Sequence, residues 1–245
     1  MRTAIRHSAF GTLNPRTIAV LVAMVVGAAG CVPQPRSAET PSPEPAATVP
    51  APPGWVEHEI PGSGVTIDLP EGWRVVTEDD LTDPDRRAEL ARDFEGAEAL
   101  FGQLEAQGRR ARIVLLAVDE RARGTGSFAP NVTVVAVEPV LPPLLLGLGA
   151  DFAIAALEST FAVETEVART NVGTPLGDGI RIAFSHRVVG PAGGRGTLAE
   201  YDGVLVTTGS ASLLVSRNID PETAPPDTPT LDEVVATLRV PDAPG

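Results

Sequence analysis

Few residues of this chain could perform chemistry, and the most distinctive of them is a single thiol. Cys31 is the only cysteine among 245 residues, so it cannot form a disulfide within the chain. Three small residues, Ala28, Ala29 and Gly30, come directly before it. A lone cysteine in an exported chain therefore needs an explanation other than an internal disulfide.

Serine, histidine and metal chemistry have little support in the sequence. His58 and His186 are the only histidines after residue 30, and His186 directly follows Ser185. Neighbouring side chains of a strand point to opposite faces, so this Ser–His pair cannot act as nucleophile and base. The His, Asp and Glu residues are not spaced so that several side chains would converge on one metal ion. The sequence also has no Gly-x-Ser-x-Gly motif and no phosphate-loop motif. We therefore expect no catalytic residues, no bound metal and no cofactor.

An acidic cluster lies between residues 78 and 85. A calcium loop would need regular alternation of its ligands and a distal glutamate, which the cluster lacks. Acidic residues are favoured at the N-terminus of a helix, where they complement the helix dipole. The cluster is therefore interpreted as the start of a helix; its members are Glu78, Asp79, Asp80, Asp83 and Asp85.

Composition divides the chain into three segments. Residues 1–30 combine Arg2, Arg6 and Arg16 with an apolar run over 18–29, which is typical of a secretory signal peptide. The run is shorter than the ~20 residues of a membrane span, which favours a cleaved signal over a permanent helix. Residues 31–54 are dense in proline and predict a semi-extended tether. Residues 55–245 have the size of one domain.

The tetrapeptide Ala28-Ala29-Gly30-Cys31 resembles a bacterial lipobox, in which leucine most often stands at the position of Ala28. The resemblance implies cleavage between Gly30 and Cys31, a diacylglyceryl group on the Cys31 thioether, and often a further acyl chain such as palmitate. Two or three acyl chains hold a protein stably on a bilayer, whereas one chain binds only marginally. The expected location is therefore the extracytoplasmic face of the cell membrane, with the lipid on Cys31 as the anchor.

The net charge of the chain argues against two kinds of partner, nucleic acid and anionic lipid. The formal net charge is −13, and removal of the three signal arginines makes the mature chain about −16. Such a chain is not expected to bind nucleic acid or to adhere electrostatically to anionic lipid. All basic residues are arginine, which, with the abundance of Ala, Gly, Pro and Val, indicates a GC-rich genome of actinobacterial type.

Hydrophobic periodicity predicts an α+β domain with a mainly antiparallel sheet and helices packed on it. Asp83 and Pro84 suit the cap and first position of a long helix that Gly108 would end. Thr230 and Glu233 form a capping box before a short closing helix. Strands are expected over 64–69, 73–76, 112–118, 131–137, 163–169, 180–189, 198–207 and 212–217, and helices over 83–108, 144–159 and 231–238.

The segment Leu69-Pro70-Glu71-Gly72-Trp73 resembles the opening of PsbP-like domains. Together with the lipobox, the tether and the closing segment 231–240, the chain is similar to the LpqN-type lipoproteins of mycobacteria and their relatives. The resemblance implies an αβα sandwich around an antiparallel sheet and an accessory or ligand-binding role in the cell envelope. It brings no catalytic residues.

The predicted helix over 144–159 is unusually apolar. Leu145, Leu148 and Phe152 lie on one side of it and could line an apolar ligand pocket against the sheet, although ordinary core packing would give the same pattern. One hypothesis is thus a non-enzymatic lipoprotein that binds an apolar or amphipathic envelope molecule or assists a transport or assembly complex. The alternative is a protein–protein interaction module without a small ligand, using the loops at 190–196 and 221–229.

Overall fold

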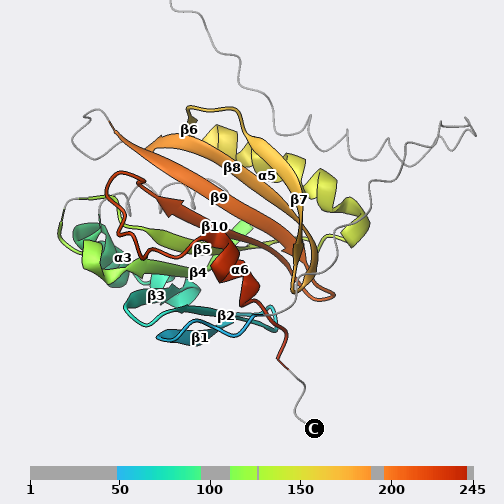
Figure 1. Ribbon diagram of the computed structural model, residues 1–245, viewed down its shortest axis with the longest axis horizontal. Helices are drawn as coiled ribbons and strands as arrows, with labels where there is room; N and C mark the ends of the chain where they lie inside the picture. The colour runs from blue at the N-terminus through green and yellow to red at the C-terminus, as the bar shows by residue number, and fades with distance from the viewer. Residues whose placement is uncertain (1–48, 95–110, 126, 189–195, 242–245) are drawn as a thin grey trace, which may run out of the picture. The chain divides into compact units, whose positions relative to one another are not determined.

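The computed structural model describes residues 49–94, 111–125, 127–188 and 196–241. The predicted signal, the lipobox with Gly30 and Cys31, and most of the tether lie outside these ranges. Within them the chain is mixed α+β, as the sequence predicts, with many strands and few helices (Figure 1).

Strands are the most abundant secondary structure in the described chain. A separate hairpin is formed by β1 and β2, and the other eight strands form one sheet. The strands are β1 (Trp55–Ile60), β2 (Val65–Pro70), β3 (Trp73–Thr77), β4 (Ala111–Asp119), β5 (Asn131–Val137), β6 (Ala162–Val163), β7 (Ala168–Thr174), β8 (Gly177–Val188), β9 (Thr197–Thr207) and β10 (Ser212–Ile219).

The helices are short apart from one. They are α2 (Glu78–Thr82), α3 (Pro84–Asp93), α5 (Leu146–Thr160) and α6 (Leu231–Ala236), with 3-10 turns η2 (Glu120–Ala122) and η3 (Pro143–Leu145). The predicted caps are confirmed. The Asp83 carboxylate accepts hydrogen bonds from the backbone of Asp85 and Arg86, and Thr230 and Glu233 form the capping box of α6.

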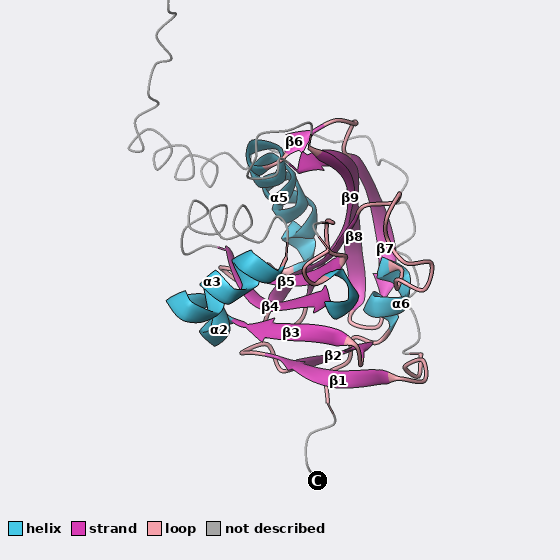
Figure 2. Cartoon of the chain, turned by 90° about the vertical axis from the view of Figure 1, so that its left-hand side faces the viewer, coloured by secondary structure: helices cyan, strands magenta, loops and turns pink. Residues whose placement is uncertain are grey.

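The eight-stranded sheet runs in the order β3-β4-β5-β10-β9-β8-β6, and β7 also pairs with β8. Every pair is antiparallel. The sheet twists from β3 and β4 at one end to β7 and β8 at the other, with α3 and α5 on one side and α6 on the other (Figure 2).

Two faces of the sheet carry separate cores. One face packs against the β1–β2 hairpin and α6 through residues such as Ile67, Val134, Leu213 and Leu238. The other face carries two clusters, one beneath α5 and one beneath α3. The strand β4 is buried from Ile113 to Asp119, so it is covered on both faces.

Two predicted elements differ from the structure. The helix expected over 83–108 stops at Asp93, because Phe94 takes an extended conformation and its ring is buried beside Leu90; the positions from 95 on lie outside the described residues. The strand expected over 163–169 is two strands, β6 and β7. The chain between them is held to β8, since the Glu164 N–H donates to the Ser185 carbonyl at 2.8 Å.

Candidate functional site

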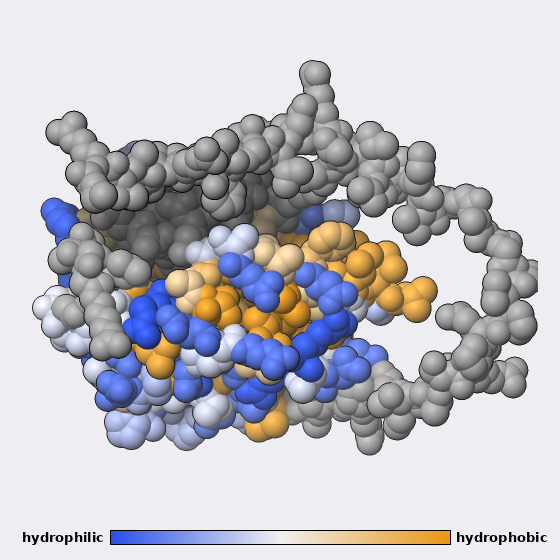
Figure 3. Space-filling model, turned by 90° about the horizontal axis from the view of Figure 1, so that it is seen from above, coloured by the Kyte–Doolittle hydropathy of each residue, from blue (hydrophilic) through white to orange (hydrophobic). Residues whose placement is uncertain are grey.

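The outward face of α5, together with the turn before it, forms an exposed apolar surface. Leu144 is 93% exposed, Leu145 44%, Leu148 52% and Phe152 68%. The sequence has no polar side chain between Glu138 and Asp151. We call these four residues the α5 outer face. Hydrophobic side chains project from the end of the molecule where α5 begins (Figure 3), so a large apolar area faces solvent rather than the core.

The segment that leads into α5 is fixed by backbone hydrogen bonds to buried hydroxyls. The Leu141 N–H donates to the Ser212 hydroxyl at 2.7 Å, and the Leu141 carbonyl accepts from the Thr207 hydroxyl at 2.7 Å. Ser212 and Thr207 come from adjacent strands, and both are buried. Pro142 and Pro143 follow at once, and proline fixes the local backbone angle φ. The projecting leucines therefore start from a rigid platform.

The first turns of α5 are held in place from two directions. An added Cβ at Gly149 would lie 2.3 Å from Cδ1 of Leu141, so any larger residue at this position would displace the Leu141 side chain. On the other side, Arg169 of β7 donates to the Gly147 carbonyl at 3.2 Å and pairs with Asp151. These contacts set the rotation of α5 and with it the direction of its outer face.

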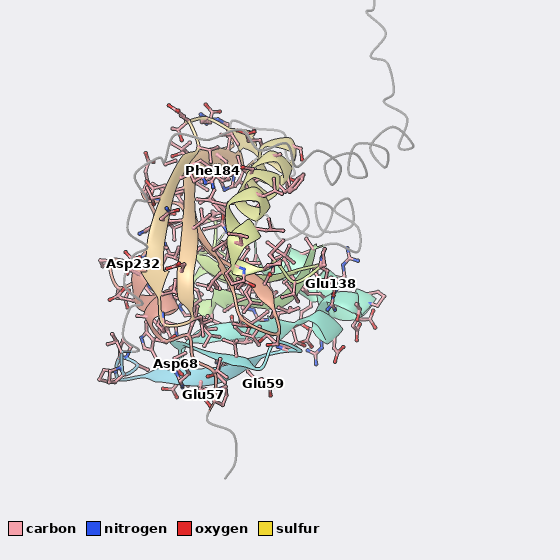
Figure 4. All side chains as sticks on the ribbon, turned by 90° about the vertical axis from the view of Figure 1, so that its right-hand side faces the viewer. Glu57, Glu59, Asp68, Glu138, Phe184 and Asp232 are labelled. Carbon is pink, nitrogen blue, oxygen red and sulfur yellow. The ribbon has the colours of Figure 1, made fainter. Side chains whose placement is uncertain are left out.

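The inward face of α5 packs on the sheet through Leu146, Ala150 and Leu157. Beneath its C-terminal end, Phe161 lies 4.4 Å from the His186 ring and 6.0 Å from the Tyr201 ring, measured between ring centroids. Phe184, which points towards α5, stacks on Tyr201 at 4.7 Å (Figure 4). Four rings from the end of α5, β8 and β9 thus make one aromatic cluster, which anchors the helix by burial.

His186 is a buried, neutral member of this cluster. The residue is 2% exposed, and no well-formed hydrogen bond from the described residues reaches either ring nitrogen. Burial lowers the pKa of His186 below its usual value, and the side chain of Asn218 opposes only part of this effect. The Tyr201 hydroxyl has no well-formed hydrogen bond within the described ranges either, and burial raises the pKa of that phenol. Both side chains therefore stay uncharged near neutral pH, as packing against aromatic rings requires.

The side chains of Ser185 and His186 do not face each other. His186 lies on the buried face that carries α5, whereas Ser185 is on the opposite face of the same strand, where its N–H donates to the Thr165 hydroxyl. His58 lies on β1, opposite Ile67 of β2. Burial lowers the pKa of His58, and the charge of Asp68 opposes this effect. In the part of the chain that the structure describes, no three His, Cys, Asp or Glu side chains are close enough to hold a metal ion.

The acidic cluster serves the helix starts, as the sequence predicts. The Asp80 carboxylate accepts from the Thr77 backbone at 3.1 Å and from its hydroxyl, which lowers the Asp80 pKa. A cavity of about 140 Å³ beside this residue is lined by Arg74, Val75, Val76, Asp80, Arg86 and Leu90. Ligand pockets measure about 300–1,000 Å³, so this small, charged cavity is no site for an apolar molecule.

The structure corrects the prediction that Leu145, Leu148 and Phe152 line a pocket against the sheet. These residues share one side of the helix, as the sequence indicated, but that side faces away from the sheet. Leu146, Ala150 and Leu157 take the inward positions instead. The physical reason is that the sheet and the aromatic cluster beneath α5 are already covered by the inward residues of the helix, which leaves its other apolar side exposed. Leu145, Leu148 and Phe152 form a surface and not the lining of a cavity.

The two loops suggested as contacts have different outcomes. Residues 189–195 lie outside the described ranges. The loop at 221–229 is held by polar contacts: the Asp220 carboxylate accepts from the Glu222 N–H and the Thr223 hydroxyl, and Asp227 pairs with Arg121 at 2.8 Å. Its role as a contact surface stays a prediction.

In the described residues, the segment Pro143–Thr160 is long and apolar enough to cross a membrane by length and composition, with a mean hydropathy of 1.3. Its α-helical part, Leu146–Thr160, packs on the sheet and rises about 22 Å, less than the ~30 Å of a hydrocarbon core.

Comparison with models of protein families and with curated protein sequences gave no match. The α5 outer face is therefore the feature from which a function has to be inferred.

Proposed function

We propose that this protein is a non-enzymatic lipoprotein of the extracytoplasmic membrane face that binds an apolar or amphipathic partner through the α5 outer face. The observation that carries the proposal is the exposure of Leu144, Leu148 and Phe152 on a helix whose opposite side is fully packed. Monomeric proteins expose single apolar residues commonly, but contiguous apolar patches usually mark interaction sites.

The contacts that hold α5 support a binding role for its outer face. Burying the outer leucines would remove them from water, yet the helix is instead fixed with these residues outside, by Arg169, by the close approach at Gly149 and by the hydrogen bonds of Leu141. Such rigid display lowers the entropy that a partner's binding would otherwise cost. The sequence features at 1–54, with Cys31 as the lipid attachment site, are what support the location.

The experiment that tests this proposal is site-specific photocrosslinking in the native host. A benzophenone amino acid replaces Leu148 in one strain and Leu198 in another. Leu198 is a matched control, because it is also a leucine, is 43% exposed, and lies on the face of the sheet opposite α5. We expect a reproducible adduct from position 148 and none from position 198.

The mass of the adduct separates the two forms of the proposal. A lipid-sized addition supports an amphipathic ligand or lipid surface, and one recurring protein band supports an envelope complex or an interaction module. If both positions give no adduct, or the same set of abundant proteins, the α5 outer face has no dedicated partner and the proposal fails.

A further inference from the structure

We infer that the occupant of the α5 outer face is the bilayer itself: the turn at Leu144 and Leu145 and the side chains of Leu148 and Phe152 insert as a wedge into an uncharged lipid surface. This inference rests on the proposed function, since it specifies the partner of the same surface. Three observations favour lipid over a protein groove.

The first observation is the form of the surface. Leu144 is 93% exposed in the middle of the 3-10 turn Pro143–Leu145, and the exposed residues continue along one side of a single helix. An isolated convex projection gains most from a fluid medium that closes around each side chain. Interfacial helices bind membranes by burying such an apolar side at the boundary between headgroups and acyl chains.

The second observation is charge. Interfacial helices that bind anionic lipid carry Lys or Arg on their polar side, whereas α5 has none. Its exposed acids are Asp151 and Glu158, and Asp151 is paired with Arg169. The chain as a whole carries −13. Insertion must therefore depend on apolar contact alone, which fits neutral headgroups and predicts little sensitivity to salt.

The third observation is reach. The described chain begins at Val49, whose N–H bonds to the Ala236 carbonyl at the end of α6, on the face of the sheet opposite α5. Val49 comes eighteen positions after Cys31, and a proline-rich segment advances about 3.1 Å per position, or about 56 Å in all. A domain of this size is about 40 Å across. A lipid on Cys31 and the α5 outer face can thus meet the same bilayer.

The test uses the acylated full mature chain, reconstituted into vesicles. Acylation consumes the Cys31 thiol, so Leu148→Cys introduces a single free thiol for an environment-sensitive NBD fluorophore, and Leu198→Cys serves as the matched control. We expect the emission of the label at position 148 to shift to shorter wavelength and rise in intensity on phosphatidylcholine vesicles, without dependence on salt. The response on phosphatidylglycerol vesicles should be no larger, and the label at position 198 should not respond.

Each of the other outcomes contradicts a defined part of this inference or of the predicted lipid anchor. No shift at position 148, or equal shifts at both positions, rejects membrane insertion. A shift at position 148 that appears without vesicles as protein concentration rises identifies a second copy of the chain as the occupant and also rejects it. If insertion fails while photocrosslinking from position 148 still captures one protein, the proposed function stands. Labelling of two thiols per chain instead shows that Cys31 is bare and rejects the anchor.

Discussion

Leu146 and Leu148 lie two residues apart on α5 and offer a matched pair of substitutions. Leu146 is 5% exposed and packs in the cluster beneath the helix, whereas Leu148 is 52% exposed on the outer face. The substitution Leu→Ala removes the same atoms at both positions and leaves a good helix former behind. A difference in stability between the two variants therefore reports burial and not helix propensity.

The expected magnitudes follow from the two environments. Removing a buried leucine costs about 2–5 kcal/mol, which includes the transfer of its atoms and the cavity left behind. Leu146 is the first residue of α5, where the structure can partly collapse, so we expect about 2–3 kcal/mol for Leu146→Ala. For Leu148→Ala we expect a change within about 0.5 kcal/mol, as for other exposed substitutions.

Urea unfolding followed by tryptophan fluorescence measures both values. The chain has two tryptophans, and Trp73 is buried in the core on the face of the sheet opposite α5, so its signal reports unfolding of the whole domain rather than local changes near the helix. Equal destabilisation by the two substitutions, or a larger effect of Leu148→Ala, would show that α5 is rotated and that its outer face is part of the core.

Three further predictions concern the supports of the fold. Burial holds the pKa of His186 below its usual value of about 6.5, so the unfolded chain takes up a proton that the folded chain resists, and stability should be lost as the pH falls below about 6.5. In urea titrations at a series of pH values, His186→Phe should lose less stability than the wild type as the pH falls. An unchanged dependence of stability on pH would be the contrary result. Gly149→Ala should cost about 1 kcal/mol in the same assay, because displacing the Leu141 side chain costs about 2 kcal/mol and the better helix propensity of alanine offsets about half of it. Gly209→Ala has no atom within 4 Å of the new Cβ and should be neutral, so equal effects would contradict the close packing of α5. Arg239→Ala should destabilise the domain by about 2–3 kcal/mol, because it leaves the buried carboxylate of Asp68, which Arg239 contacts at 2.6 Å, without its charged partner. The cost is smaller than for a fully buried pair, since Arg239 itself is partly exposed. An unchanged unfolding midpoint would mean that this pair contributes nothing.

Local sequence signals predicted most elements of the fold. Hydrophobic patterning located β2, β4, β5, β8, β9 and β10: β2 alternates apolar and polar residues, β4 is a continuous apolar run, and β5 is rich in β-branched residues. Capping chemistry located the starts of α3 and α6. These features depend on a few neighbouring residues. The end of α3 could not be found in this way, because Phe94 leaves the helix to fill a site in the core that only the folded sheet creates.

The direction of α5 was harder to predict, because the helix is apolar on more than one side. A signal was nevertheless present. Asp151 and Glu158 are seven residues apart and fall on the same side of a helix as Leu148 and Ala155, and both acids are exposed. Charged residues mark the solvent side of a helix, so they indicated that Leu148 faces outwards. The close approach at Gly149 and the aromatic cluster around His186 depend on contacts between distant strands, which no local pattern reveals.

Metabolic labelling with a fatty-acid analogue tests the central claim most directly, namely that a lipid on Cys31 holds this domain on a membrane where the α5 outer face can work. The wild-type chain should incorporate the label and sediment with the membrane fraction, and Cys31→Ala should do neither. Equal labelling of the two chains, or a wild-type protein recovered from the medium with a free thiol, would contradict the account.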